Sequence, residues 1–100
     1  MAQFDVYRCN KDGVEYLIDL QDEMLDGLST RVVAPLVALS SVEARLKIVN
    51  PLITVDTRSC VMLTHLLAAI PLSSLGEPIA TAGMQREEIV AALDLLFTGV

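Results

Sequence analysis

The sequence contains no tryptophan, one histidine and two cysteines. The histidine, His65, stands in an apolar run without the nucleophile and orienting partner that a catalytic base needs, so we expect it to be a structural or partly exposed strand residue. The Gly-x-Ser-x-Gly motif, glycine-rich phosphate loops and His-x-x-x-His pairs are missing as well. We therefore expect no catalytic residue, no metal site and no cofactor.

The two cysteines, Cys9 and Cys60, lie far apart and lack the CxxC spacing of redox or zinc sites. We expect two free, buried thiols, with a single disulfide as the alternative. Long hydrophobic runs are also lacking, and the N-terminus has neither the basic start nor the apolar stretch of a signal peptide. These features are typical of a soluble, cytoplasmic protein without membrane contact.

Positive charge is scarce: seven Lys and Arg residues stand against 13 Asp and Glu residues, for a formal net charge of −6. An acidic chain is repelled by phosphate backbones, and the basic residues are scattered without aromatic neighbours. Direct contact with nucleic acid is therefore disfavoured, and a partner with a basic surface fits this charge better.

Apolar residues, by contrast, are abundant, at 53% of the 100 residues. This length is enough for one domain, residues 1–100. A domain so small cannot bury all of this apolar surface by itself, so the surplus predicts a homo-oligomer whose interface covers part of it.

Short runs of alternating and β-branched residues fill most of the chain before the last quarter. They predict strands at 4–8, 16–20, 31–36, 52–55, 60–64, 67–71 and 79–81. Turn residues at 10–13 and 56–59 join two pairs of these strands into hairpins. Pro35 cannot donate a ladder hydrogen bond, so it indicates an edge strand or a bulge. Residues 39–49 fit either a short helix or a loop with a helical turn.

A helical period begins at Gly83, with Glu87 and Glu88 in the first turns, and Gly99 marks its end. Its apolar positions include Ile89, Val90, Leu93, Leu96 and Phe97. Apart from Asp94 this helix is apolar on most sides, which indicates a second covering surface on another copy of the chain. The predicted fold class is mainly β with a C-terminal α-helix, arranged as a small antiparallel barrel or sandwich.

Two apolar segments stand in unusual places. Met24 and Leu25 lie in the polar loop 21–30, where they either tuck back into the core or wait for a partner. The acids around them, Asp19, Asp22, Glu23 and Asp26, fit a solvated loop better than a metal site. The chain end at 95–100 is apolar to its last residue, so it either folds into a core or dimer interface or forms a recognition tip.

The sequence resembles the CcdB family of toxins from CcdA/CcdB toxin–antitoxin pairs. The resemblance runs nearly end to end and rests on the order and spacing of several short motifs. These are Gln3-Phe4-x-Val6-Tyr7, Asp19-x-Gln21, Arg31-x-Val33-x-Pro35-Leu36, Gly76-Glu77 and Leu95-x-Phe97-x-Gly99.

This resemblance implies an SH3-like, CcdB-like antiparallel β-barrel that forms a homodimer. It also implies binding to the A subunit of DNA gyrase, poisoning of that topoisomerase, and neutralisation by a CcdA-like antitoxin, as in plasmid maintenance. By position, the gyrase contacts of the family fall on Met24, Leu25, Asp94, Phe97, Thr98, Gly99 and Val100. We expect the dimer interface to include Leu93, Leu96, Phe97 and Val100.

The ending departs from the family, whose toxic members carry Trp-Gly-Ile where this chain has Thr98-Gly99-Val100. The family's asparagine in the last helical turn is replaced by Asp94. A non-toxic homologue that still binds an antitoxin is therefore an alternative. A further alternative is an endoribonuclease of the MazF and Kid type on the same barrel, although the acidic charge weighs against it.

Overall fold

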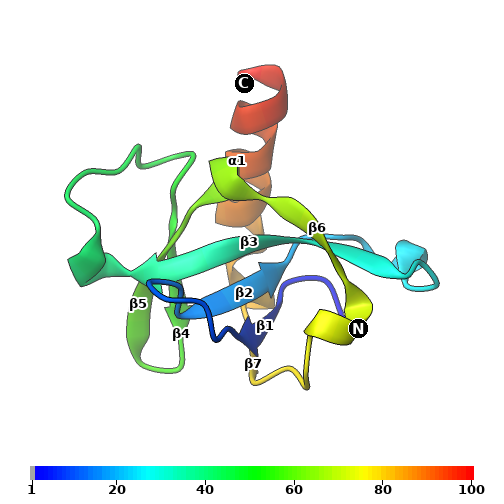
Figure 1. Cartoon of the computed structure of the whole chain (residues 1–100). Helices are drawn as coiled ribbons and strands as arrows, with labels where there is room; N and C mark the ends of the chain where they lie inside the picture. Colours follow the sequence, from blue (N-terminus) through cyan, green and yellow to red (C-terminus); the bar gives the residue numbers. More distant parts are fainter. Residues whose placement is uncertain (1) are drawn as a thin grey trace.

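The computed structural model describes residues 2–100 and confirms a mainly β chain with a C-terminal helix (Figure 1). The strands are β1 (Asp5–Arg8), β2 (Tyr16–Asp19), β3 (Thr30–Ala38), β4 (Leu52–Val55), β5 (Arg58–Met62), β6 (Ala68–Pro71) and β7 (Ala80–Thr81). The helix α1 (Arg86–Thr98) follows β7 after a single 3₁₀ turn.

These strands belong to one antiparallel sheet that forms a nearly closed barrel, as predicted. The order along the sheet is β4-β5-β3-β2-β1-β7, and β6 pairs with the first half of β3. β3 is the longest strand and pairs with β2, β5 and β6, so it runs through the middle of the molecule in Figure 1.

Both predicted hairpins are present. β1 and β2 pair with Val6 opposite Ile18, and Gly13 adopts a left-handed φ of 82° in the turn between them. β4 and β5 place Val55 opposite Arg58, so their turn is tighter than the predicted 56–59. Asp56 permits the tighter turn because its φ of 54° supplies the left-handed conformation that two-residue hairpin loops need.

Of the two alternatives predicted for Pro35, the edge strand is wrong, since β3 has neighbours on both sides, and there is no bulge toward β2, because that pairing continues in register with Pro35 opposite Leu17. On one side, β3 pairs first with β6, as far as Val33, and then with β5, from Leu36 onward. Pro35 lies in the gap between these two pairings. Its carbonyl accepts the N–H of Leu63 at 3.0 Å. A residue without an N–H fits this junction because the regular ladder is interrupted there.

The core lies between the inner face of the barrel and one stripe of α1. Its fully enclosed members come from several strands and from the helix: Val6, Ile18, Leu36, Ile53, Met62, Ile89 and Ala92. Strand alternation explains this set, because every second residue of a half-buried strand faces inward. Cys60 also belongs to the core, and burial raises the pKa of its thiol.

Both cysteines are free, as predicted, but Cys9 is only half-buried. The prediction of a second buried thiol is therefore wrong. Cys9 lies just after β1 ends, where the chain leaves the sheet for the turn toward Gly13.

Residues 39–49 form a loop with one 3₁₀ turn, Leu39–Ser41, so the helical alternative is wrong. The buried side chain of Asn50 closes this loop by donating to the Met62 carbonyl at 3.2 Å and accepting the N–H of Leu46 at 3.3 Å. His65 is exposed nearby, with Nδ1 3.4 Å from the Asn50 amide nitrogen. It lies in the 3₁₀ turn Thr64–Leu66 rather than in a strand.

The beginning of α1 is tied to β4 by Gln85. The side-chain amide of Gln85 donates to the Leu52 carbonyl and accepts the N–H of Thr54, both at 2.8 Å. At the other end Gly99 adopts a left-handed φ of 78° and its N–H bonds to the Leu95 carbonyl, the C-terminal stop predicted from the sequence. In Figure 1 the last turns of α1 project beyond the sheet.

Candidate functional site

Both apolar segments that the sequence marks for recognition are exposed. Met24 is 92% exposed and Leu25 48%, while Phe97 is 69% exposed and Val100 88%. The alternatives in which the Met24–Leu25 pair or the tail folds into the core of its own chain are therefore wrong. Asp94, Thr98 and Gly99 are accessible as well, so all seven predicted gyrase contacts can be reached in the single chain.

Met24 and Leu25 lie within a short 3₁₀ turn, Glu23–Leu25. The turn forms because Asp22 caps it: its carboxylate accepts the N–H of Met24 at 2.8 Å. The N–H of Leu28 then bonds to the Leu25 carbonyl at 3.1 Å. These local bonds project Met24 away from the barrel while its backbone stays satisfied.

A buried polar cluster of Asp19, Gln21 and Arg31, the Arg31 cluster, fixes this loop to the sheet. The guanidinium of Arg31 donates from Nε to Asp19 at 2.9 Å and from Nη2 to the Gln21 carbonyl at 2.8 Å. The side chain of Gln21 accepts the N–H of Val32 at 3.0 Å and donates to the carbonyl of Leu25 at 3.4 Å. The Arg31 cluster thus connects the two ends of the loop 21–30. Through Gln21 it also contacts the backbone of Leu25, one of the predicted gyrase contacts.

The prediction that Asp19 belongs to a solvated acidic loop is wrong, since its side chain is fully buried against Arg31. Burial raises the pKa of Asp19, although the hydrogen bonds from Arg31 and from the N–H of Gln21 favour the charged form. Asp22, Glu23 and Asp26 are exposed as predicted. Asp26 lies 3.6 Å from Nη1 of Arg31, so it faces the cluster from outside.

One side of the C-terminal tail packs against the barrel, and the other side is exposed to solvent. Leu93 and Leu96 are half-buried, and Leu93 packs against the core of its own chain. Phe97 and Val100 remain largely exposed. Among the predicted interface residues, these two have the most apolar surface left for a partner. The hydroxyl of Thr98 donates to the Asp94 carbonyl at 2.7 Å, so it is used within the helix.

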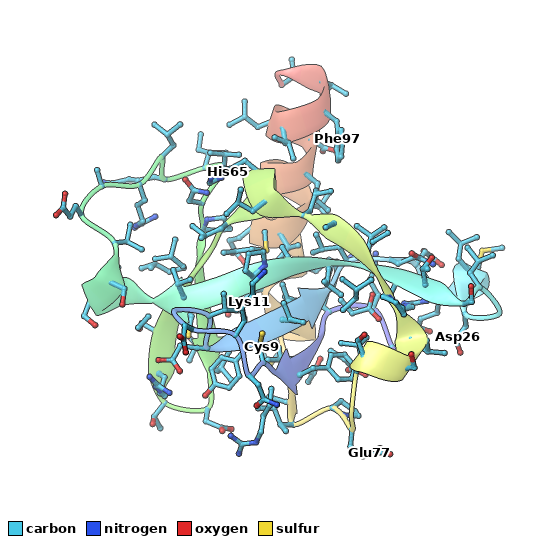
Figure 2. All side chains as sticks on the ribbon, viewed as in Figure 1. Cys9, Lys11, Asp26, His65, Glu77 and Phe97 are labelled. Atoms are coloured by element: carbon cyan, nitrogen blue, oxygen red, sulfur yellow. The ribbon has the colours of Figure 1, made fainter. Side chains whose placement is uncertain are left out.

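Within one chain, the loop 21–30 and the C-terminal tail, residues 95–100, do not form one continuous surface patch. In Figure 2 Phe97 lies near the upper end of α1, whereas Asp26 lies at the far end of β3. A partner that contacts both segments has to span this separation or meet them on two copies of the chain.

Further exposed apolar side chains lie outside the predicted site: Leu28, Leu39, Leu46, Ile48, Leu52, Leu66 and Met84. Sequence reasoning missed them because single apolar residues do not reveal whether they face in or out. Within the part of the chain that the structure describes, no group of three or more His, Cys, Asp or Glu side chains is placed to hold a metal ion. Across residues 2–100, no helix combines the length and apolar character that crossing a bilayer requires.

The fold and these exposed segments define a class: a small, nearly closed antiparallel barrel with one C-terminal helix that carries apolar side chains outward. A family model described as CcdB protein matches residues 3–99. Because the match covers nearly the whole chain, this chain belongs to the CcdB family, and it is a toxin of the CcdB type from a toxin–antitoxin system.

Proposed function

We propose that this protein binds the A subunit of DNA gyrase, inhibits the topoisomerase and is neutralised by a CcdA-like antitoxin. The observation that carries the proposal is the exposed apolar tail, in which Phe97 and Val100 remain accessible at the end of a helix anchored to the barrel. A rigid helix end lowers the conformational entropy that a recognition segment loses on binding. The protein would act in the cytoplasm, where gyrase works, and serve plasmid maintenance.

We also propose that the protein acts as a homodimer. The two copies of the tail would lie side by side across a two-fold axis, since isologous contacts repeat the same residues on both protomers. Leu96, Phe97 and Val100 would form the shared surface together with Leu93. A doubled apolar tip would then meet a symmetric partner such as the paired A subunits of gyrase.

The side chain at position 98 would strongly affect the affinity of such a tip for gyrase. Thr98 is exposed, and its hydroxyl group bonds back to the helix, so it offers a partner no flat apolar surface. Aromatic anchors supply much of the affinity of protein interfaces. This observation favours the second candidate function, a CcdB homologue that binds an antitoxin but poisons gyrase weakly or not at all.

The endoribonuclease alternative has less support. Arg31 is buried against Asp19, and Arg58 pairs with Glu15 at 2.8 Å. Arg86 donates to Gln3 at 3.1 Å. Guanidinium groups that are spread over the fold and engaged with neighbours do not converge on a scissile phosphate.

The test compares the wild type with two variants, Thr98→Trp and Thr57→Trp. The second variant is the control, because it makes the same change in the exposed turn between β4 and β5, outside the C-terminal tail. Purified protein is measured for binding to the gyrase A subunit and for inhibition of supercoiling. We expect Thr98→Trp to tighten binding by about tenfold or more and Thr57→Trp to leave it unchanged. Failure of folded wild type and folded Thr98→Trp to bind gyrase would refute the proposal.

A further inference from the structure

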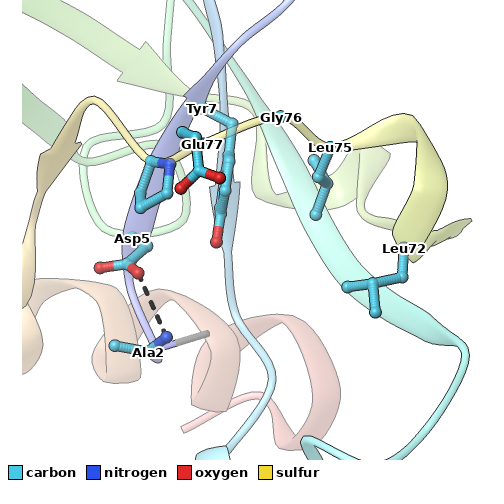
Figure 3. A pocket seen from close by; sticks show the side chains of 8 residues that line it. Ala2, Asp5, Tyr7, Leu72, Leu75, Gly76 and Glu77 are labelled. Carbon is cyan, nitrogen blue, oxygen red and sulfur yellow. Dashed lines mark hydrogen bonds between the residues drawn. The ribbon is translucent and has the colours of Figure 1, made fainter.

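A cavity of about 450 Å³ lies at the end of the molecule where β1 begins, outside the recognition segments described above. Its walls come from the start of the chain, from β1 and from residues 72–78, which lead toward β7 (Figure 3). In Figure 2 Glu77 lies at the lower end of the view and Phe97 near the upper end. The cavity is thus remote from the tail that the proposed function uses.

The polar atoms of the cavity wall are suited to accept hydrogen bonds. Asp5 and Glu77 contribute carboxylates, and the lining within residues 2–100 includes no Lys, Arg or His. One oxygen of Asp5 accepts the N–H of Ala2 at 3.1 Å, which orients this carboxylate (Figure 3). An ionised carboxylate offers about four acceptor positions, so both groups retain capacity for a ligand.

Tyr7 supplies the second observation. Its side chain is fully buried and lines the cavity, yet its hydroxyl group has no hydrogen-bond partner among the described residues. Buried polar groups without a partner are uncommon in folded proteins, and each calls for an explanation such as a bound molecule. Burial, helped by the nearby Asp5, raises the pKa of Tyr7 to about 12, so the hydroxyl group stays protonated and uncharged near neutral pH.

The remaining wall is aliphatic. Leu72 and Leu75 are half-buried, and Pro78 stands beside Glu77. Alkyl chains with a charged end bury their methylene groups against such surfaces while the charged end reaches polar partners. Acceptors at one side and aliphatic side chains at the other therefore match an alkyl guanidinium or alkyl ammonium group, which has donors and no acceptor.

We propose that this cavity binds an organic cation of that class, held by Asp5, Glu77 and the Tyr7 hydroxyl. The cation is either an arginine or lysine side chain of a basic polypeptide or a free polyamine. Both sources present the same donor group. The inference does not depend on gyrase binding, because none of the seven predicted contacts lines the cavity.

The test titrates isotope-labelled protein with N-acetyl-arginine amide, with N-acetyl-lysine amide and with spermidine, and follows amide chemical shifts by NMR. N-acetyl-citrulline amide, which has nearly the shape of the arginine derivative without its charge, is the matched control probe. We expect saturable shifts at Asp5, Tyr7, Gly76 and Glu77 for at least one cation and none for the citrulline derivative. Saturation by an amino-acid amide assigns the site to a polypeptide side chain, and saturation by spermidine alone assigns it to a polyamine.

Three variants probe the residues. Asp5→Asn and Glu77→Gln should each weaken binding by about tenfold, since hydrogen bonds to charged groups are the stronger ones. Tyr7→Phe should weaken binding by a smaller factor. Glu87→Gln, the same charge change on the exposed face of α1, is the control and should leave binding unchanged. No saturable shift with any cation, equal binding of the citrulline derivative, or an equal loss in Glu87→Gln would overturn the proposal.

Discussion

At the scale of single residues, Arg31 is a fully buried cation paired with a fully buried carboxylate. Neither its guanidinium group nor the Asp19 carboxylate is accessible to solvent. Removing two charges from water costs several kcal/mol each, and their attraction offsets this only when the geometry is good. Here the Arg31–Asp19 contact at 2.8 Å and the bond to the Gln21 carbonyl supply part of that geometry, while Nη1 makes no hydrogen bond to the described residues and lies 3.6 Å from Asp26. The pair therefore specifies the path of the loop rather than adding a large surplus of stability.

Arg31→Met tests this view through the pH dependence of stability. The variant leaves Asp19 buried without its cation, so the free energy of unfolding at pH 7 should fall by about 3–5 kcal/mol. The pKa of Asp19 in the folded variant should rise further above its unfolded value of about 3.9. Between these two pKa values the folded state binds more protons, so stability is greatest at low pH and falls as pH rises.

Urea unfolding followed by circular dichroism at about pH 4 and pH 7 measures this effect. The difference between wild type and Arg31→Met should be smaller at the lower pH, because Asp19 is then neutral in the variant. The double variant Asp19→Leu with Arg31→Met should recover part of the loss, since it leaves no buried charge. A difference that is unchanged or larger at low pH would show that Asp19 is not the cause.

At the scale of elements, the parts that follow from local chemistry were predictable. The hairpin of β1 and β2 follows from alternation around Gly13, and the end of α1 follows from Gly99. The errors concern partners distant in sequence. Pro35 is tolerated because β3 changes neighbours there, and Asp19 is buried because Arg31, twelve residues later, lies against it. Neither fact can be inferred from the pattern of residues in a short stretch of sequence.

The residues of the candidate site also divide into those that the local sequence predicts and those that depend on contacts distant in sequence. The apolar residues Met24, Leu25 and Phe97 were identifiable because they interrupt a polar loop or end the chain, where polar residues are usual. The Arg31 cluster and the cavity beside Tyr7 were not, because each combines segments that only the folded barrel brings together.

Gln85 offers a test of how α1 is attached. Its side chain makes two hydrogen bonds to the backbone of β4, so Gln85→Ala should lower the free energy of unfolding by about 1–2 kcal/mol. The Thr54 amide loses its acceptor and should exchange its hydrogen faster. Glu87→Ala, on the exposed face of the same helix, should change stability by about 0.5 kcal/mol or less. Unchanged protection of Thr54 in Gln85→Ala would contradict this attachment.

At the scale of the whole molecule, the surplus of apolar residues noted in the sequence is visible on the surface. Among residues 2–100, eleven large apolar side chains are exposed in the single chain, and Phe97 and Val100 lie together at one end of it. Half-buried Leu96 adds to the same end of α1. Exposed apolar side chains that gather at one end of a small chain often mark an interface, which favours a second copy that covers one side of the tail and leaves the other side accessible.

A dimer formed through the tail should depend on the protein concentration and on Leu96. We expect sedimentation velocity to show a dimer across about 1 to 100 μM, and the melting temperature to rise with concentration, because association stabilises the folded state. Leu96→Glu should give a folded monomer, since two like charges would meet near the two-fold axis. Leu46→Glu makes the same change at a side chain that is 71% exposed in the loop before Asn50, and it should remain dimeric. A wild type that stays monomeric at the highest concentration, or a Leu46→Glu variant that dissociates as readily as Leu96→Glu, would place the interface elsewhere or remove it.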